Sequence, residues 1–565
     1  MKKINRILSV IALSALTLSF HSCKDYLTEQ APGQTTLNDY FTSTAAAVQT
    51  VTAAYTPLMW EFNETYCCEW FIGDIASDDA LKGGGSTSDM ADVFDIENWR
   101  TTSQNTLLKD FYRAQYQGIA RANLAIQYIS AMEVGLDDDF TQAMKNRLLG
   151  EAYFLRAYYY FRLVRIFAGV PLVTTVVDNS DSWPVERASV ETIFNQILSD
   201  MEQANKLLPV KSSSLYTSED LGRATKGAAQ AMLMKVNLYM ASPFWRGQDE
   251  ATRTGITKSE TDCYSDAKMW GDSIITSGEY DLCPNYEDNF TLAGENGIES
   301  VFEIQYADVL WGSYAGENDP IHFGYTAGSF TQTLVRSRST LIGSGWGFNH
   351  PTWDLYNEFE ALDSIRRAAA IINPYDPTWI ESVTGDPTSV LVQNVAEEGY
   401  LGNFLLNNKY GLYRAEEGGG YGVRPYTHDS RGPLNNRQIR YADVLLMHAE
   451  ACLKTGDVGS AKTDINRVRS RVGLGDVEAT EASLRHERRC ELAMEGHRWF
   501  DLVRWEGVDG NGLKAHMDAY KANESAEVQG QINEFIAGKH ELFPIPNEEI
   551  SLNPTNTPMQ QNPQY

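Results

Sequence analysis

Three side chains within one short stretch have types and spacing close to those of a zinc hydrolase. His486, Glu487 and Cys490 spell H-E-x-x-C. In the related H-E-x-x-H motif, two histidines one helical turn apart bind zinc and the glutamate acts as a base. A cysteine thiolate can also bind zinc, but the sequence indicates no third ligand. We therefore expect no metal site here.

Other catalytic motifs are absent from the sequence. The nine histidines form no H-x-H cluster, no glycine-rich loop ends in Lys-Ser or Lys-Thr, and no G-x-S-x-G elbow occurs. Two carboxylates a few ångströms apart suffice for a glycosidase, and among 75 acidic residues nothing singles out such a pair. We expect no cofactor, and a secreted glycosidase stays open as an alternative function.

The positive chemical signal is a set of aromatic side chains in irregular stretches. Trp and Tyr rings stack on the apolar C–H face of a pyranose ring, while polar side chains bind its hydroxyl groups. Competing with this interpretation, any single ring can simply pack against the body of the protein. The rings that have no helical stripe to pack into are the best candidates for ligand contacts. We predict as contacts Trp99, Trp311, Trp346 and Tyr314, together with the nearby acid Asp74.

Amphipathic patterns predict the elements that must position these residues. Residues 107–130 and 144–168 predict two long helices, residues 190–208 and 224–241 predict another pair, and residues 440–473 predict a helix-turn-helix. The last unit has the length and the small crossing residues of a tetratricopeptide repeat without its full consensus. We predict a mainly α, tetratricopeptide-like helical-repeat body.

The helical pattern fails in residues 284–437, which are rich in glycine and aromatic residues. Loops of this length inside a compact protein are usually functional. We therefore expect this insertion to form an irregular, loop-rich face that is functional or covers something. It would separate an N-terminal helical part, residues 37–283, from a C-terminal helical part, residues 438–565.

Charge and composition limit the possible partners. The chain has 565 residues, 43% of them hydrophobic, and a formal net charge of -28. This composition is that of a globular protein, and the length exceeds that of a single core. Such an acidic surface repels the phosphate backbone, so we expect no nucleic-acid partner.

The N-terminus has the pattern of a lipoprotein signal. Residues 1–22 place three basic residues ahead of an apolar run that is too short to span a bilayer, and Cys23 follows directly. We predict lipidation at Cys23 and a polar tether at residues 23–36. A secretory leader with a chance cysteine is the alternative. Among the remaining cysteines, Cys263 with Cys283 is the one pairing that we consider.

The segment Leu484 to Trp505 interleaves charges and bulky apolar groups so closely that we expect a buried, structural charge network. Its string ERRCELAMEGHRWFDLVRW resembles the signature of the SusD/RagB family of outer-membrane lipoproteins. Similar to the same family are GEAYFLRAYYYFRLVRIFAGVPLV from Gly150, RYADVLLMHAEACLKTGD from Arg440 and the C-terminal LFPIPNEEISLNP. The family's glycine before the final tyrosine is Gln564 here.

This resemblance implies that the insertion, residues 284–437, lies over the helical repeats as a loop-rich ligand-binding face. It implies a protein that is anchored in the outer membrane by its lipid alone, faces the cell exterior and captures oligo- or polysaccharide without catalysis. It also implies delivery of that ligand to a SusC-like TonB-dependent transporter. Capture of peptides or of another nutrient by the same route is the alternative within this family.

Replacing the predicted lipidated cysteine tests the anchor. We expect Cys23→Ala to move the protein from the membrane fraction to the soluble fraction, because the acyl chains that hold it would be missing. Fractionation and metabolic labelling with a fatty acid measure this change. Unchanged fractionation of the variant, together with no acyl label on the wild type, would contradict the prediction.

Overall fold

The computed structural model describes residues 37–61, 69–177, 186–247, 252, 254–307, 328–339, 345–388, 405–411, 431–506, 511–552 and 559–565. Cys23, Trp311 and Tyr314 lie outside these residues, as do the predicted signal and tether. The described chain is mostly α-helical with a few short strands, which confirms the predicted fold class. No helix in this part of the chain is long and apolar enough to cross a membrane.

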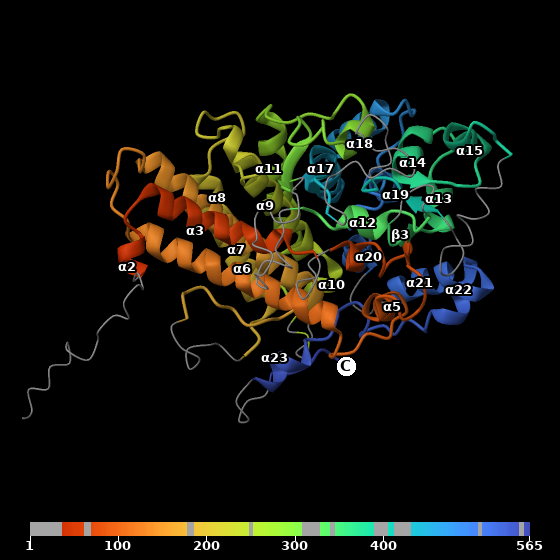
Figure 1. Ribbon diagram of the computed structural model, residues 1–565, viewed down its shortest axis with the longest axis horizontal. Coiled ribbons are helices and arrows are strands. Elements are labelled where there is room, and N and C mark those ends of the chain that lie inside the picture. The colour runs from red at the N-terminus through yellow and green to blue at the C-terminus, as the bar shows by residue number, and fades with distance from the viewer. Residues whose placement is uncertain are drawn as a thin grey trace, which may run out of the picture.

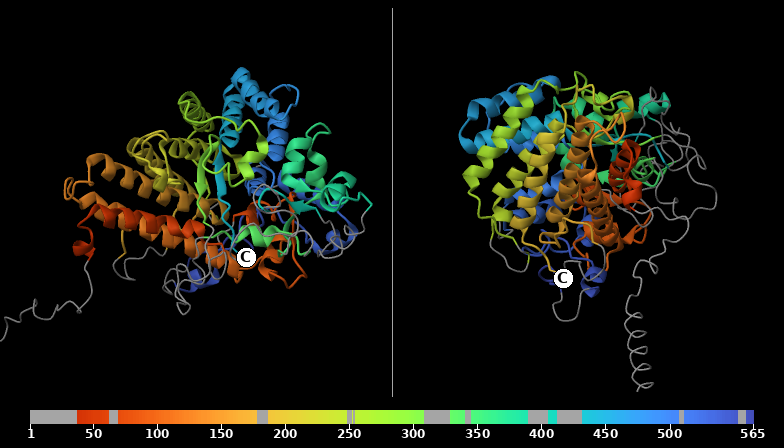
Figure 2. Two further views of the ribbon diagram at one scale, coloured as in Figure 1. Left: turned by 45° about the horizontal axis from the view of Figure 1, so that its top comes forward. Right: turned by 90° about the vertical axis from the view of Figure 1, so that its left-hand side faces the viewer.

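The body is a stack in which each long helix packs on the next one in chain order (Figure 1, Figure 2). The stacked helices are α3 (Thr44–Tyr55), α6 (Thr106–Ala131), α7 (Gln142–Phe167), α8 (Val190–Leu207), α9 (Lys226–Ala241), α11 (Glu260–Thr276), α17 (Tyr441–Thr455) and α18 (Val458–Arg471). Side-chain caps fix several starts: Thr141 accepts a hydrogen bond from Met144 N, and Ser189 accepts one from Thr192 N. The stack is the predicted helical-repeat body.

Most of these helices follow the sequence pattern. The predicted ends of α6, α7, α8, α9 and the α17–α18 pair lie within two residues of the observed ends. Helix α11 was not predicted; the side chains that it buries include those of Cys263 and Ala267, with Gly271 on the same helix. Gly271 has to be small, since a Cβ there would lie 2.5 Å from the His448 ring of α17.

The chain leaves this stack after α11 and returns at α17, which packs directly on α11. Strand β2 (Ser300–Ile304) pairs antiparallel with β6 (Asn436–Arg440), so the two ends of the intervening segment are joined. Before β2 lies η5 (Tyr286–Phe290), and between β2 and β6 lie α12 (Thr331–Val335), β3 (Phe348–Pro351), α13 (Trp353–Glu358), α14 (Ser364–Ala370), β4 (Ile371–Ile372), α15 (Pro377–Thr384) and β5 (Leu406–Asn407). These helices are too short to show a periodic pattern, which explains why the sequence predicted loops.

The insertion lies at one end of the molecule. Helices α13 to α15 lie on the right in Figure 1, at the opposite end of the horizontal axis from α2 (Leu37–Tyr40), and the left-hand view of Figure 2 shows the same arrangement. Its strands are short: β3 pairs with β1 (Ala80–Gly83) and β4 pairs with β5. The other described elements are η2 (Thr56–Met59), α4 (Trp70–Gly73), α5 (Ala91–Glu97), η4 (Ser218–Asp220), α10 (Pro243–Arg246), α19 (Glu481–Glu491), α20 (Arg498–Glu506), α21 (Asn511–Asn523), α22 (Ala526–Gln531) and α23 (Asn547–Ser551).

The disulfide that we considered is not formed. Cys263 and Cys283 are both free and buried. Cys263 is a buried residue of α11, whereas Cys283 follows that helix and its backbone N–H donates to Glu299 Oε2 at 2.8 Å. Each thiol thus behaves as a small buried side chain.

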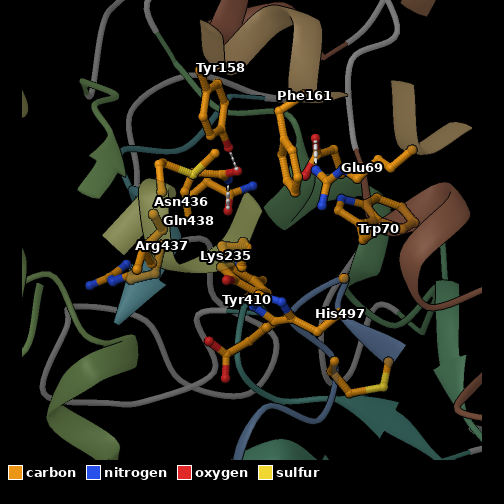
Figure 3. A pocket seen from close by; sticks show the side chains of 16 residues that line it. Glu69, Trp70, Tyr158, Phe161, Lys235, Tyr410, Asn436, Arg437, Gln438 and His497 are labelled. Carbon is orange, nitrogen blue, oxygen red and sulfur yellow. Dashed lines mark hydrogen bonds and ion pairs between the residues drawn. The ribbon is translucent and has the colours of Figure 1, made fainter. Parts of the chain in front are cut away.

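A small polar cavity remains where α7, α9 and β6 meet the turn before α20 (Figure 3). Tyr158 Oη donates to Gln438 Oε1 at 2.5 Å on one side, and Arg165 pairs with Glu69 on another. The cavity measures about 30 Å³, which holds about two water molecules and no sugar ring. We therefore look for the ligand site elsewhere.

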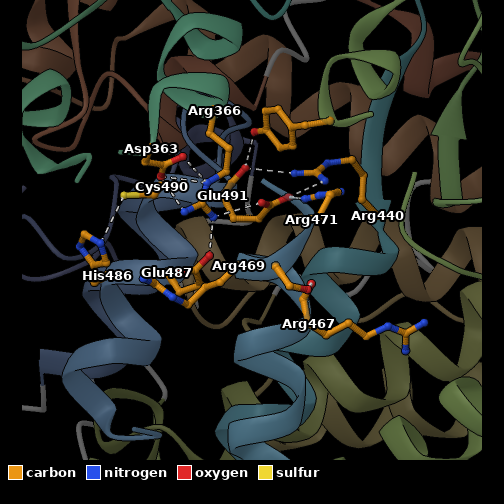
Figure 4. A network of polar contacts seen from close by, with 12 residues as sticks. Asp363, Arg366, Arg440, Arg467, Arg469, Arg471, His486, Glu487, Cys490 and Glu491 are labelled. Carbon is orange, nitrogen blue, oxygen red and sulfur yellow. Dashed lines mark hydrogen bonds and ion pairs between the residues drawn. The ribbon is translucent and has the colours of Figure 1, made fainter. Parts of the chain in front are cut away.

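A buried ion network joins the insertion to the stack (Figure 4). Arg440 Nη1, at the end of β6, lies 2.6 Å from Glu299 and 3.0 Å from Glu491 of α19. Arg471 of α18 contacts the same two carboxylates, and Arg366 of α14 lies 3.3 Å from Glu491. The predicted charge network of this segment is thus confirmed, and it fixes α14 and β6 against α18 and α19.

The network makes stability depend on pH. Burial opposes the charge on Glu491, yet Arg471, Arg440 and Arg366 around it lower its pKa to about 2. A carboxyl whose pKa is lower in the folded than in the unfolded chain stabilises the fold above its unfolded pKa, near ~4. That contribution is lost as the pH falls from there toward 2.

The second half of the segment offers a direct test of its structural role. Asp501 lies 3.0 Å from Arg488 Nε and 2.8 Å from Arg504 Nε. We expect Asp501→Ala to lower the free energy of unfolding by about 2–4 kcal/mol, because it leaves two buried guanidinium groups short of a partner. Arg498→Ala should act in the same way through the buried carboxylate of Asp78, 2.8 Å away. Chemical denaturation measures both.

An exposed ion pair provides the matched control. Lys462 pairs with Glu478 at 2.6 Å on the surface, where their side chains are 41% and 80% exposed. Lys462→Ala should therefore leave the unfolding transition unchanged. If Asp501→Ala and Arg498→Ala were as stable as this control but lost a ligand selectively, the segment would be a binding site.

Candidate functional site

Trp346 is the predicted ring that the structure leaves partly exposed, and the backbone around it is well fixed. The backbone N–H of Trp346 donates to Thr333 O at 2.8 Å, and the backbone N–H of Gly347 donates to Arg336 O at 2.8 Å. Its ring meets the ring of Phe330 edge-on, with centroids 5.0 Å apart. Helix α12 and its flanking residues therefore hold the indole in one place at the surface.

A glycine-rich corner lies beside this ring. Gly83 of β1 pairs with Phe348 of β3, and its φ of 74° is one that favours glycine. A Cβ on Gly83 would lie only 2.2 Å from Gly347 O, so no other residue fits without movement. The corner brings the loop that follows β1 close to Trp346.

Two charged side chains complete this surface. Arg338 Nη1 lies 3.4 Å from Asp89 Oδ2 and 3.4 Å from Trp346 O, and the side chains of Arg338 and Asp89 are 41% and 34% exposed. Asp89 also accepts a hydrogen bond from Gly85 N at 2.7 Å. We call Trp346, Arg338, Asp89 and the Gly83–Gly85 corner the Trp346 surface. The sequence did not predict Arg338 or Asp89, whose only signal is their position beside glycine-rich loops.

Lys82 supports the same loop from inside. Its Nζ donates to Ser86 O at 2.8 Å and to Asp89 O at 2.5 Å, and it lies 5.4 Å from the centre of the Phe348 ring. Burial lowers the pKa of this ammonium group to about 8. An ammonium group that binds two backbone carbonyls fixes the path of the loop and so the place of Asp89.

Glu61 is a second support that the sequence did not reveal. Its buried carboxylate accepts hydrogen bonds from Tyr306 Oη at 2.9 Å, Ser329 Oγ at 2.8 Å and Phe330 N at 2.6 Å. Tyr306 precedes residues 308–327, which contain two of the predicted rings, and Ser329 follows them. One carboxylate thus joins Tyr306 to Ser329 and to the backbone of Phe330, whose ring contacts Trp346.

Trp99 does not lie at this surface. It is 7% exposed, and its ring centre lies 5.2 Å from that of Trp499, 5.1 Å from that of Phe535 and 5.7 Å from that of His540. The prediction that this ring has nothing to pack against is wrong. Its partners come from the far end of the chain, where no local pattern could reveal them.

Asp74 is also buried, with 1% exposure. Its Oδ1 accepts a hydrogen bond from Gly496 N at 2.8 Å, and its Oδ2 accepts one from Asn349 Nδ2 at 3.2 Å. The carboxyl therefore links the end of α4 to the turn between α19 and α20. Its predicted place at a ligand surface is wrong, since its neighbours are structural.

The H-E-x-x-C side chains have separate partners. His486 Nδ1 lies 2.7 Å from Glu358, whereas Glu487 pairs with Arg366 and, at 3.0 Å, with Arg469. Cys490 Sγ lies 3.9 Å from His486 Nε2. Among the described residues no group of three or more His, Cys, Asp or Glu side chains could hold a metal ion.

The buried carboxyl of Asp74 gives a testable pH effect. Burial raises its pKa to about 7, with the charge of Asp79 adding to the effect. A carboxyl with a raised pKa stabilises the folded state at low pH, and this contribution is lost as the pH rises from its unfolded pKa of ~4 through 7. We expect Asp74→Asn to melt higher than wild type at about pH 8, with the difference shrinking toward about pH 5. Thermal melting across this range measures it.

The nearby amide of Asn349 strengthens this expectation, since its Oδ1 has no hydrogen-bond partner among the described residues and can accept from the new amide once the Asn349 amide flips. The control is Asp443→Asn. Burial opposes the charge on Asp443, yet Lys235 and Arg488 hold its pKa well below its usual range. Asp443→Asn should therefore be less stable than wild type throughout the range from about pH 5 to about pH 8. Equal pH profiles for Asp74→Asn and wild type would refute our assignment.

Two segments of the chain match known families. Residues 391–565 match the SusD family, and residues 25–238 match a family described as starch-binding and associating with the outer membrane. The two matches cover most of both helical parts.

Individual proteins are similar over nearly the whole chain. A SusD-like protein of Bacteroides ovatus is 27% identical over 508 residues, which cover 88% of this chain and 82% of that protein. The starch-binding protein SusD of Bacteroides thetaiotaomicron is 22% identical over 542 residues, which cover 89% of this chain and 86% of that protein.

A solved structure shows the same fold. Surface glycan-binding protein A from Bacteroides thetaiotaomicron, in complex with laminarihexaose, superposes with a TM-score of 0.70 at 23% identity and covers 92% of this chain and 99% of that one. The chain belongs to the SusD/RagB family.

Proposed function

We propose that this protein is a non-catalytic, cell-surface glycan-binding protein that captures oligo- or polysaccharide on the Trp346 surface. The observation that carries the proposal is the partly exposed indole of Trp346, fixed between α12 and β3. A large aromatic ring that is held in place at the surface offers a flat apolar face on which a ligand can stack.

The chemistry of this surface suits a sugar. The indole face takes the C–H side of a pyranose ring, while an exposed guanidinium and a carboxylate take hydroxyl groups. The Arg338–Asp89 contact is long, at 3.4 Å, so both groups keep capacity for further hydrogen bonds. Gly83, Gly84 and Gly85 add no side chains to this surface.

Relatives support a glycan as the ligand. One of them is named for starch binding, and one structural neighbour holds laminarihexaose. We further propose that the chain is anchored in the outer membrane through a lipid on Cys23 and faces the cell exterior. From there it would deliver the glycan to a SusC-like TonB-dependent transporter.

Such a capture protein needs only modest affinity. Dissociation constants of roughly millimolar to micromolar correspond to about 4–8 kcal/mol. A single stacking ring can supply a large share of so small a total.

Replacing the ring tests the proposal. We expect Trp346→Ala to abolish binding to laminarin and to starch in affinity electrophoresis, with the melting temperature lowered by no more than about 2 °C, because the ring is only partly buried. The matched control is Trp270→Ala, a partly buried Trp on helix α11 of the stack, which should bind as wild type does.

Other outcomes would point to other functions. If Trp346→Ala binds both polysaccharides as tightly as wild type, the site lies elsewhere. Binding to peptides and to no sugar on a mixed array would favour peptide capture. Release of shorter products during an overnight digest of either polysaccharide would favour a glycosidase.

A further inference from the structure

A second group of partly exposed rings lies on the insertion, at the other end of β3 from Trp346. Trp353 begins α13, and its ring meets that of Tyr356 edge-on, with centroids 5.3 Å apart. The Tyr375 ring lies 6.4 Å from that of Trp353, tilted by 35°, and Tyr375 is 44% exposed. Contiguous exposed apolar patches on a protein mark interaction sites.

The polypeptide around these rings is rigid. Thr352 N donates to Asp79 O at 2.9 Å, and Thr352 Oγ1 donates to Asp78 O at 2.7 Å. Asp78 and Asp79 are in turn held by Arg489, at 3.0 Å and 2.8 Å. The backbone next to Trp353 is therefore tied to a buried ion network. Because the protein is already ordered here, it loses little conformational entropy when a ligand stacks on the ring.

Tyr356 and Trp353 differ in how many contacts their polar groups make. One face of Tyr356 is covered by the guanidinium of Arg367, 5.0 Å from the ring centre, and its Oη accepts a hydrogen bond from Asn373 Nδ2 at 3.3 Å. Tyr356 is thus a packing ring. By contrast, the indole N–H of Trp353 has no hydrogen-bond partner among the described residues, so it can donate to a ligand hydroxyl.

We infer that Trp353 and Tyr375 form a second sugar-stacking surface, which binds a stretch of polysaccharide separate from the stretch on the Trp346 surface. This inference rests on the proposed function. Aromatic rings combined with a free N–H favour a sugar over a purely apolar partner, which would use aliphatic side chains as well.

The place of this surface favours the same ligand as occupant. Trp346 and Trp353 flank β3 and are seven residues apart in sequence, so their Cα atoms are at most about 25 Å apart. Two weak sites at this separation bind a long chain more tightly than either does alone, because the second contact is made at high effective concentration. A short oligosaccharide gains nothing from the second site.

Chain length therefore provides the test. We would measure binding of laminaritriose and of polymeric laminarin, with maltotriose and starch in parallel, by isothermal titration calorimetry or affinity electrophoresis. For Trp353→Ala and for Tyr375→Ala we expect unchanged affinity for the trisaccharide and about tenfold weaker binding of the polysaccharide. Trp353→Phe, which keeps a ring, should recover most of the difference.

The outcomes separate this inference from the proposed function. If the wild type binds neither polysaccharide, or if Trp346→Ala has no effect, the proposed function fails. If Trp346→Ala abolishes binding while both Trp353→Ala and Tyr375→Ala bind the polysaccharide as wild type does, the second surface is only a packing cluster. Tyr375→Ala keeps the test valid if Trp353→Ala unfolds, since the Tyr375 side chain is the more exposed of the two.

Discussion

The buried charges around Glu491 are the interaction on which the rest of this structure depends. Glu491 and Glu299 are surrounded by Arg440, Arg471 and Arg366, and all of these side chains are at most 3% exposed. Charges this deeply buried are costly when one partner is missing, because the remaining charge has no solvent to stabilise it. These contacts therefore join α14 and β6 of the insertion to α18 and α19.

The same logic extends outward from this network to the ligand surface. Arg489 and Arg498 hold Asp78 and Asp79, whose carbonyl groups bind Thr352 at the end of β3. At the other end of β3, the backbone of α12 and the carboxylate of Glu61 fix Trp346 and Phe330. Ion pairs within the body thus determine where the exposed rings stand, although none of these charges lies at the ligand surface.

The sequence predicted the stack well and the binding surface poorly, for physical reasons. Helices such as α7 and α17 carry long apolar stripes that are visible locally, and capping residues such as Thr141 mark their starts. The partners of Trp99 and Asp74, which are Trp499 and Gly496, lie hundreds of residues away, so local pattern could not show that these side chains are buried. Arg338 and Asp89 meet only because the β1–β3 pair brings two loops together.

A rigid protein that presents a few fixed aromatic rings is well suited to bind a flexible polymer weakly. When the rings are already fixed, binding has to order only the sugar and not the protein, so a few stacking contacts give usable affinity. Trp346 and Trp353 are fixed by different supports: a carboxylate with helix backbone for one, and a buried ion network for the other. Each surface can therefore lose its ring without disturbing the other, which makes their contributions to polymer binding separable by single substitutions.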